Sequence, residues 1–176
     1  MLTVTEVPPS DVTLSRNKSF LESYRMNDTH AYQVTANWEA GRNGNVSATG
    51  IQPAIPFSTP PEFQGIDGLW TPEHFLVAAV ASCFVVTFYG VAAASKLEFS
   101  SLHVDMEGKL GKPEGKLRFT EIILRPILVV PPAADPERAK RILEKAKGNC
   151  LIALSLFCPV FMEPQVRSVE AILATE

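Results

Sequence analysis

Clusters of basic residues are absent from this sequence. Its 16 lysines and arginines and its 19 aspartates and glutamates are spread along 176 residues, and the net charge is −3 at pH 7. A nucleic-acid-binding domain normally carries a basic patch, and so does a segment that binds an anionic membrane surface. We therefore expect neither nucleic acid nor a membrane as a partner.

Ligand sets for metals and phosphates are missing as well. The three histidines, His30, His74 and His103, lie far apart, and no two of them have the spacing of a zinc site. The sequence has no glycine-rich phosphate loop and no Gly-x-Ser-x-Gly nucleophile turn. We predict no metal and no bound cofactor.

Cysteines are few, and their number is odd. Cys83, Cys150 and Cys158 are widely spaced, which argues against a secreted disulfide framework and favours a reducing compartment with free or cycling thiols. The first twelve residues have neither the basic region nor the apolar stretch of a signal peptide. These observations predict a cytoplasmic protein.

One long apolar run is present, from Phe75 to Ala94. Its twenty residues carry no charge, and that length is enough to cross a bilayer. However, the run is rich in alanine and contains Ser82 and Thr87, and its flanks carry Glu73 and Lys96 rather than a basic cluster. The pattern favours a central helix in a core or at a dimer interface, and a membrane span is the alternative.

The remaining pattern predicts an α+β domain over residues 31–176, preceded by an appendage of residues 1–30. Gly41-Arg42-Asn43-Gly44 is a hairpin signal. Strands are expected at residues 31–38, 45–50, 51–57, 102–110, 117–130 and 165–173, and helices at 72–96, 136–148 and 150–157. Strands followed by helix, hairpin, helix and strand indicate antiparallel sheets.

Cys83 and Cys150 are the candidate reactive groups. A thiol in apolar surroundings has a raised pKa and reacts poorly, so Cys83 alone is typical of a packing residue. A cation from elsewhere could activate it, and Arg42 at the hairpin tip is a candidate, although such residues are usually solvated. Cys150 would begin a short helix whose dipole favours a thiolate, or it is a small buried residue. Cys158 has no supporting context and is expected to be structural.

A wider pattern connects these residues. The segment Pro72-Glu73-x-Phe75-Leu76-x-x-Ala79-x-x-x-Cys83 resembles the OsmC/Ohr family of osmotically inducible and organic hydroperoxide resistance proteins. The resemblance extends to the Arg-x-Gly hairpin at Arg42 and to Cys150, which follows a helix with Glu144-Lys145-Ala146. It covers residues 31–173.

The resemblance implies a fold, an activity and a site. The fold is OsmC-like, with antiparallel sheets, a long apolar central helix and an intertwined homodimer. The activity is that of an antioxidant peroxidase in the oxidative stress response, which reduces organic hydroperoxides to alcohols. Cys83 matches the peroxidatic cysteine, Cys150 the cysteine that resolves its sulfenic acid to a disulfide, and Arg42 and Glu73 a pair that completes the site. An external dithiol, lipoyl-type or another thiol, would then reduce the disulfide.

One feature departs from the family pattern, and one alternative function stays open. The family usually follows its second cysteine with Pro-x-Ser, whereas this chain has Leu151-Ile152-Ala153-Leu154. The alternative is a non-catalytic protein of the same fold that binds small hydrophobic ligands at its dimer interface.

The spacing of Glu73 and Cys83 adds a geometric constraint. Ten residues on one helix correspond to about 15 Å along the axis and leave the two side chains roughly 80° apart around it. Glu73 cannot reach its own cysteine. If both serve one site, Glu73 must come from a partner chain. We expect Arg42 to come from that chain too, and the apolar run is then dimer core.

Overall fold

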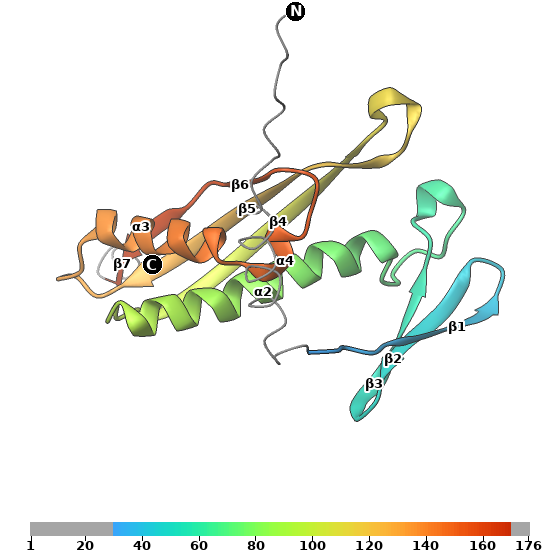
Figure 1. The fold of residues 1–176 in the computed structure, drawn as a ribbon, viewed down its shortest axis with the longest axis horizontal. Coiled ribbons are helices and arrows are strands. Elements are labelled where there is room, and N and C mark those ends of the chain that lie inside the picture. The colour runs from blue at the N-terminus through green and yellow to red at the C-terminus, as the bar shows by residue number, and fades with distance from the viewer. Residues whose placement is uncertain (1–29, 170–176) are drawn as a thin grey trace, which may run out of the picture.

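The computed structural model describes residues 30–169. The expected appendage, apart from His30, lies outside these residues, and so do residues 170–173 of the last expected strand. Two sheets and three α-helices make up the described part, with the long helix α2 (Pro72–Ala94) running through its middle (Figure 1). The predicted α+β class with a long central helix is confirmed.

The first sheet is a three-stranded antiparallel meander of β1 (Thr35–Ala40), β2 (Asn43–Ala48) and β3 (Ile51–Ser58). The predicted hairpin turn is present, and Gly41 has a φ of 55° there, a left-handed conformation that glycine adopts without steric cost. The first strand begins later than expected, at residue 35 rather than 31. All six residues of β1 are exposed, so none of the other described elements covers this strand.

The two faces of this sheet differ in chemistry. Trp38 and Phe57 flank Gly44 on one face, and Trp38 is 75% exposed. On the other face, Asn37 donates to Asn45, which in turn donates to Glu39. The sheet joins the rest of the fold chiefly at one end, where Phe57 packs edge-on against Phe75 of α2 with ring centres 6.3 Å apart.

Helix α2 begins as its sequence predicts. The Thr71 hydroxyl accepts a hydrogen bond from the His74 backbone N–H at 3.3 Å, and Pro72 occupies the first helical position. Four residues at helical spacing are buried: Val80, Phe84, Phe88 and Ala92. This buried stripe fixes the rotation of the helix against its neighbours.

The second sheet is built on a long antiparallel hairpin, β4 (Ser101–Gly111) and β5 (Arg118–Val130). The strands β6 (Val160–Met162) and β7 (Gln165–Ser168) pair with β5 in the parallel direction. The sheet is therefore antiparallel in its hairpin and parallel at its short strands, because the chain returns from β5 through α3 (Pro136–Gly148). The sequence did not predict β6, since three residues carry no readable alternation.

The prediction of a short helix over residues 150–157 is wrong in its length and in its first residue. Helix α4 is a single turn, Leu151–Leu154, and Cys150 precedes it as the N-cap with extended backbone (φ −71°, ψ 105°). The turn ends where the Ser155 hydroxyl donates to the Leu151 carbonyl at 2.9 Å, taking the place of a further helical bond. Cys150 therefore lies between α3 and α4 and not inside a helix.

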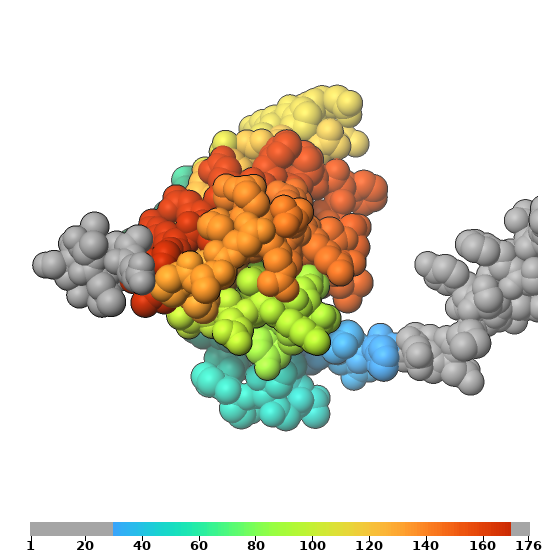
Figure 2. Space-filling model, turned by 90° about the vertical axis from the view of Figure 1, so that its left-hand side faces the viewer, coloured from blue at the N-terminus to red at the C-terminus, as the bar shows by residue number. Residues whose placement is uncertain are grey.

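The core lies where α2 and α3 pack on the inner face of the second sheet. It combines residues of α2 (Phe84, Phe88, Ala92), of β5 (Leu124, Leu128, Val130), of α3 (Ala139, Ile142, Leu143, Ala146), Leu97 and Cys150. The α3 positions are those that the helical spacing predicted. Figure 2 shows α2 (green) reaching the surface between α3 (orange) and the first sheet (cyan), so one side of the central helix is uncovered.

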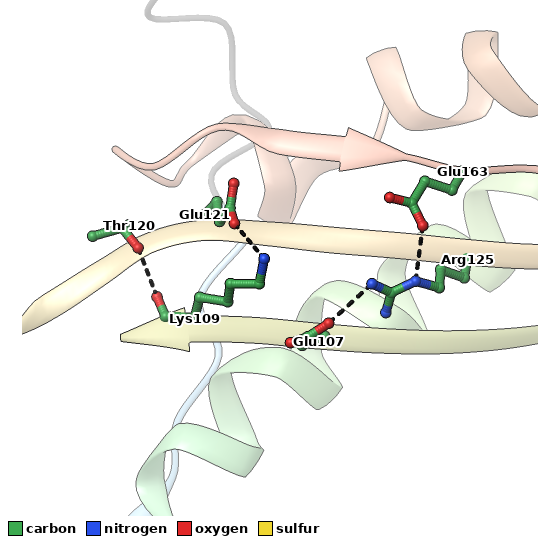
Figure 3. Close-up of polar contacts among 6 residues, drawn as sticks. All are labelled: Glu107, Lys109, Thr120, Glu121, Arg125 and Glu163. Atoms are coloured by element: carbon green, nitrogen blue, oxygen red, sulfur yellow. Dashed lines mark hydrogen bonds and ion pairs between the residues drawn. The ribbon is translucent and has the colours of Figure 1, made fainter. Parts of the chain in front are cut away.

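The outer face of the second sheet is polar. Arg125 of β5 binds Glu107 of β4 and Glu163 beyond β6, each at 2.9 Å, and Lys109 pairs with Glu121 at 2.7 Å (Figure 3). These ion pairs tie three chain segments together but are solvent-exposed, where such pairs contribute little to stability. The stability of this region therefore comes from the opposite, apolar face.

Leu143→Ala should lower the free energy of unfolding by about 2–5 kcal/mol, because Leu143 is fully buried and its removal leaves a cavity between α3 and the sheet. Urea unfolding followed by circular dichroism measures this. The matched control is Arg141→Ala on the same helix, whose side chain is 69% exposed and whose effect should stay within about 0.5 kcal/mol. Equal losses in the two variants would contradict the assigned core.

Candidate functional site

The structure brings two of the four predicted site residues together. Cys83, in the middle of α2, is half-buried and packs against the core, and Cys150 is a member of that core with 1% exposure. The two thiols are close enough in space for each to shift the pKa of the other, although 67 residues separate them in the sequence. Both are free thiols in this structure.

Hydrogen-bond donors surround the Cys83 sulfur. Partial burial opposes its ionisation, but the backbone N–H of Ile152, the Cys150 thiol, the Thr87 hydroxyl and the backbone N–H of Leu151 together outweigh that penalty, so the pKa of Cys83 lies below its usual value. Most of these donors come from the start of α4. Neutral donors from the described residues thus already favour Cys83 as the thiolate of the pair.

Cys150 is shifted in the opposite direction. Burial is the main reason that the pKa of Cys150 lies above its usual value, and the neighbouring Cys83 sulfur adds to the effect. Its Sγ lies 3.9 Å from the Val80 carbonyl oxygen, to which it can donate. The pair therefore consists of one thiol with a lowered pKa and one with a raised pKa.

Arg42 and Glu73 lie away from the two thiols. Arg42 is exposed in the β1–β2 turn, and its carbonyl accepts a hydrogen bond from the Thr59 N–H at 3.3 Å. Glu73 lies in the first turn of α2, ten residues before Cys83. Within one chain, the described contacts connect neither residue to Cys83.

Glu73 carries an unsatisfied polar atom. Its Oε2 is buried and has no hydrogen-bond partner, which is rare for a carboxylate oxygen. Beside it lies a cavity of about 310 Å³ with mostly apolar walls, lined by Pro60, Pro61, Glu62, Phe63, Thr71, Glu73, His74 and Leu110. Because Thr59 contacts Arg42 and precedes this wall, Arg42 and Glu73 belong to the same end of the molecule.

The third cysteine, Cys158, lies outside this site. Cys158 borders a different hollow, formed with the β4–β5 connection, in which Arg118 and Phe157 also take part. Among residues 30–169, no group of three or more His, Cys, Asp or Glu side chains is placed to hold a metal ion.

Sequence reasoning missed the neutral donors to Cys83. Thr87 follows Cys83 by four residues, a spacing that places two side chains on the same helix face, and this signal could have identified it. The N–H groups of Leu151 and Ile152 had no such signal, because they reach Cys83 only through the packing of α4 on α2.

Comparison with known proteins identifies the family. Residues 65–164, more than half of the chain, match the model of the OsmC-like protein family. The chain therefore belongs to this family, which includes peroxiredoxin-type enzymes.

Two curated relatives cover most of the chain. The uncharacterized protein YmaD of Bacillus subtilis is 29% identical over 132 residues, covering 72% of this chain and 87% of that protein. Peroxiredoxin OsmC of Escherichia coli is 24% identical over 137 residues, covering 76% of this chain and 94% of that protein.

Solved structures share the fold. An OsmC-like protein of unknown function from Vibrio cholerae has a TM-score of 0.71 at 24% identity, covering 77% of this chain and 99% of that one. An organic hydroperoxide resistance protein OsmC from Legionella pneumophila has a TM-score of 0.65 at 22% identity, with 80% and 99% covered. The OsmC-like fold predicted from the sequence is confirmed.

The two thiols should titrate in a fixed order. On raising the pH, Cys83 should become alkylated first and Cys150 last, because donors lower the pKa of Cys83 and burial raises that of Cys150. Timed iodoacetamide labelling of the reduced protein, read by peptide mass spectrometry, measures each site. Cys150→Ala removes one donor and should move the Cys83 labelling midpoint to higher pH. Labelling of Cys150 before Cys83 would contradict the assignment.

Proposed function

We propose that this protein is a thiol-dependent peroxidase that reduces organic hydroperoxides to alcohols. The observation that carries the proposal is the Cys83–Cys150 pair: two neighbouring free thiols, one with a lowered pKa and one buried. Membership of a family that includes peroxiredoxin-type enzymes supports the same chemistry.

The reaction begins at Cys83. Its thiolate attacks one oxygen of the hydroperoxide, the O–O bond breaks, and the alkoxide takes up a proton to leave as alcohol. Cys83 is then a sulfenic acid. The Cys150 sulfur attacks the Cys83 sulfur, water leaves, and a Cys83–Cys150 disulfide forms. An external dithiol, lipoyl-type or other, is oxidised as it returns both residues to thiols.

The surroundings of the two sulfurs fit these separate roles. A thiolate is the nucleophilic form of cysteine, and the half-buried Cys83 is the sulfur that a peroxide can reach. Cys150 is 1% exposed, so its accessible reaction partner is the neighbouring Cys83. The unusual Leu151 and Ile152 supply their donors through the backbone, and a polar side chain is not required there.

We also propose that the complete site forms in a homodimer. The Glu73 Oε2 without a partner calls for a donor, and the Arg42 guanidinium is the candidate at that end of the molecule. Glu73 and Arg42 of one chain would then act beside Cys83 of the other. Within the chain, only 22% of the most apolar stretch of α2 is buried. In the proposed dimer, a helix of the partner packs on the uncovered side of α2, so that α2 forms the dimer core of a cytoplasmic protein.

Cys83→Ser should abolish peroxide consumption, because it removes the attacking sulfur. Cys150→Ser should permit about one turnover and then stop at a sulfenic acid that excess peroxide overoxidises. Consumption of cumene hydroperoxide and of hydrogen peroxide, with dihydrolipoamide or dithiothreitol as reductant, measures both. Cys158→Ala is the control and should leave turnover nearly intact. Sustained turnover in Cys83→Ser would remove the peroxidase from consideration.

Mixed dimers test the shared site. Cys83→Ser chains should be inactive alone, and Arg42→Ala chains should lose at least about tenfold in activity, since a charged hydrogen bond to the reacting group is removed. Refolded together, they should regain part of the activity, because a mixed dimer holds one intact site. The readout is turnover of mixed dimers that have been isolated by differential affinity tags. A stable, active monomer in sedimentation experiments would overturn the shared site.

The apolar cavity beside Glu73 favours a second candidate function, binding of a small hydrophobic ligand without catalysis. The two functions predict different numbers of free thiols after organic hydroperoxide is added. A peroxidase loses two free thiols per chain on addition of one equivalent of organic hydroperoxide, whereas a binding protein loses none on that timescale.

A further inference from the structure

Thr87 touches the sulfur that the proposed reaction uses. Its Oγ1 lies 3.9 Å from the Cys83 Sγ, one helical turn further along α2. Both side chains are partly buried on the same face of the helix, and either atom could be the donor while Cys83 is a neutral thiol. The family resemblance assigned no role to this threonine.

Ionisation of Cys83 would fix the direction of this contact. A thiolate has no proton and can only accept, whereas a threonine hydroxyl carries one proton that it can donate. The usual competitor for that proton in a helix is the carbonyl one turn earlier. Among the described residues, the hydrogen bonds of Thr87 include the contact with Cys83 and none to a backbone carbonyl.

The side chain of threonine suits a fixed donor. Because it is branched at Cβ, few χ1 rotamers are open to it within a helix, so its hydroxyl loses little freedom on holding one direction. The charged residues nearest to Cys83 along α2 and its ends are Glu73 and Lys96, ten and thirteen positions away. A neutral donor next to the sulfur therefore has no cationic competitor on its own helix.

We propose that Thr87 is a positioning residue: its hydroxyl donates a hydrogen bond to the Cys83 thiolate and holds the sulfur toward Cys150. The contribution of Thr87 to turnover rests on the proposed peroxidase function, but its hydrogen bond to Cys83 does not. The groups that face Cys83 are the Thr87 hydroxyl from α2, and the Cys150 thiol with the N–H groups of Leu151 and Ile152 from the α4 side. Cys150 is the titratable one among them.

The experiment compares Thr87→Val with Thr87→Ser in the full-length chain carrying Cys158→Ala. Valine keeps the branched shape of threonine but loses the hydroxyl, and serine keeps the hydroxyl. Ser82→Ala is the matched control, because the Ser82 hydroxyl on the same helix donates to the Ala79 carbonyl and does not touch Cys83. Thermal unfolding confirms that each variant is folded.

The first readout is the rate of Cys83 alkylation against pH. Thr87→Val should lower the rate roughly tenfold below the midpoint and move the midpoint to higher pH, because a hydrogen bond to a charged group is lost. Thr87→Ser and Ser82→Ala should stay within about twofold of the parent. Should Thr87→Val fail to fold, the comparison of Thr87→Ser with Thr87→Ala gives the same contrast.

The second readout is turnover of cumene hydroperoxide, which separates the two proposals. If the parent protein consumes no peroxide, the proposed peroxidase function is wrong. If Thr87→Val is folded and keeps the parent's alkylation midpoint, the proposed role of Thr87 is wrong, whatever the turnover. A Thr87→Ser variant that is as impaired as Thr87→Val would also overturn the inference, because keeping the hydroxyl would then not preserve the effect on Cys83.

Discussion

The packing of α2 against α3 and β5 is the constraint on which the rest of this structure depends. Phe84 and Phe88 are buried completely in that contact, and they set the rotation of the helix. Cys83 directly precedes Phe84, so it is turned to the edge of the core and meets the segment where α3 ends. Loosening this contact would first change the distance between the two sulfurs, and only then the reactivity of each thiol.

The same packing gives the two sulfurs different surroundings. Cys150 lies at the inner side of the contact, among apolar groups that oppose its charge, whereas Cys83 meets the backbone donors of the following turn. Within one chain, the two thiols already differ because of neutral donors and burial. Charged residues belong to the periphery, in the ion pairs of the outer sheet face and at the end where Glu73 and Arg42 lie.

Much of the fold could be predicted because its signals are local. Thr71 and Pro72 mark the start of α2, Asp135 and Pro136 that of α3, and Ala139, Ile142, Leu143 and Ala146 mark the buried side of α3. The single turn α4 and the strand β6 are too short for a periodic signal, and tertiary contacts determine them.

Less of the candidate site could be predicted from local signals. The approach of Cys150 to Cys83 depends on the crossover through α3, which residue spacing cannot reveal. The resemblance to a family indicated this approach. In the proposed homodimer, Arg42 and Glu73 reach the sulfurs of the other chain, an arrangement that depends on a second copy and not on local signals in the sequence.

The separation of the β1–β3 sheet from the core has a consequence for the dynamics of the chain. This sheet is joined to α2 mainly through Phe57, Trp70 and Phe75, and its first strand is exposed throughout. Its backbone amides can therefore exchange with solvent by a local opening that leaves α2, α3 and β5 intact. We therefore expect the isolated chain to open in two steps of unequal stability, with the Arg42 turn in the part that opens first.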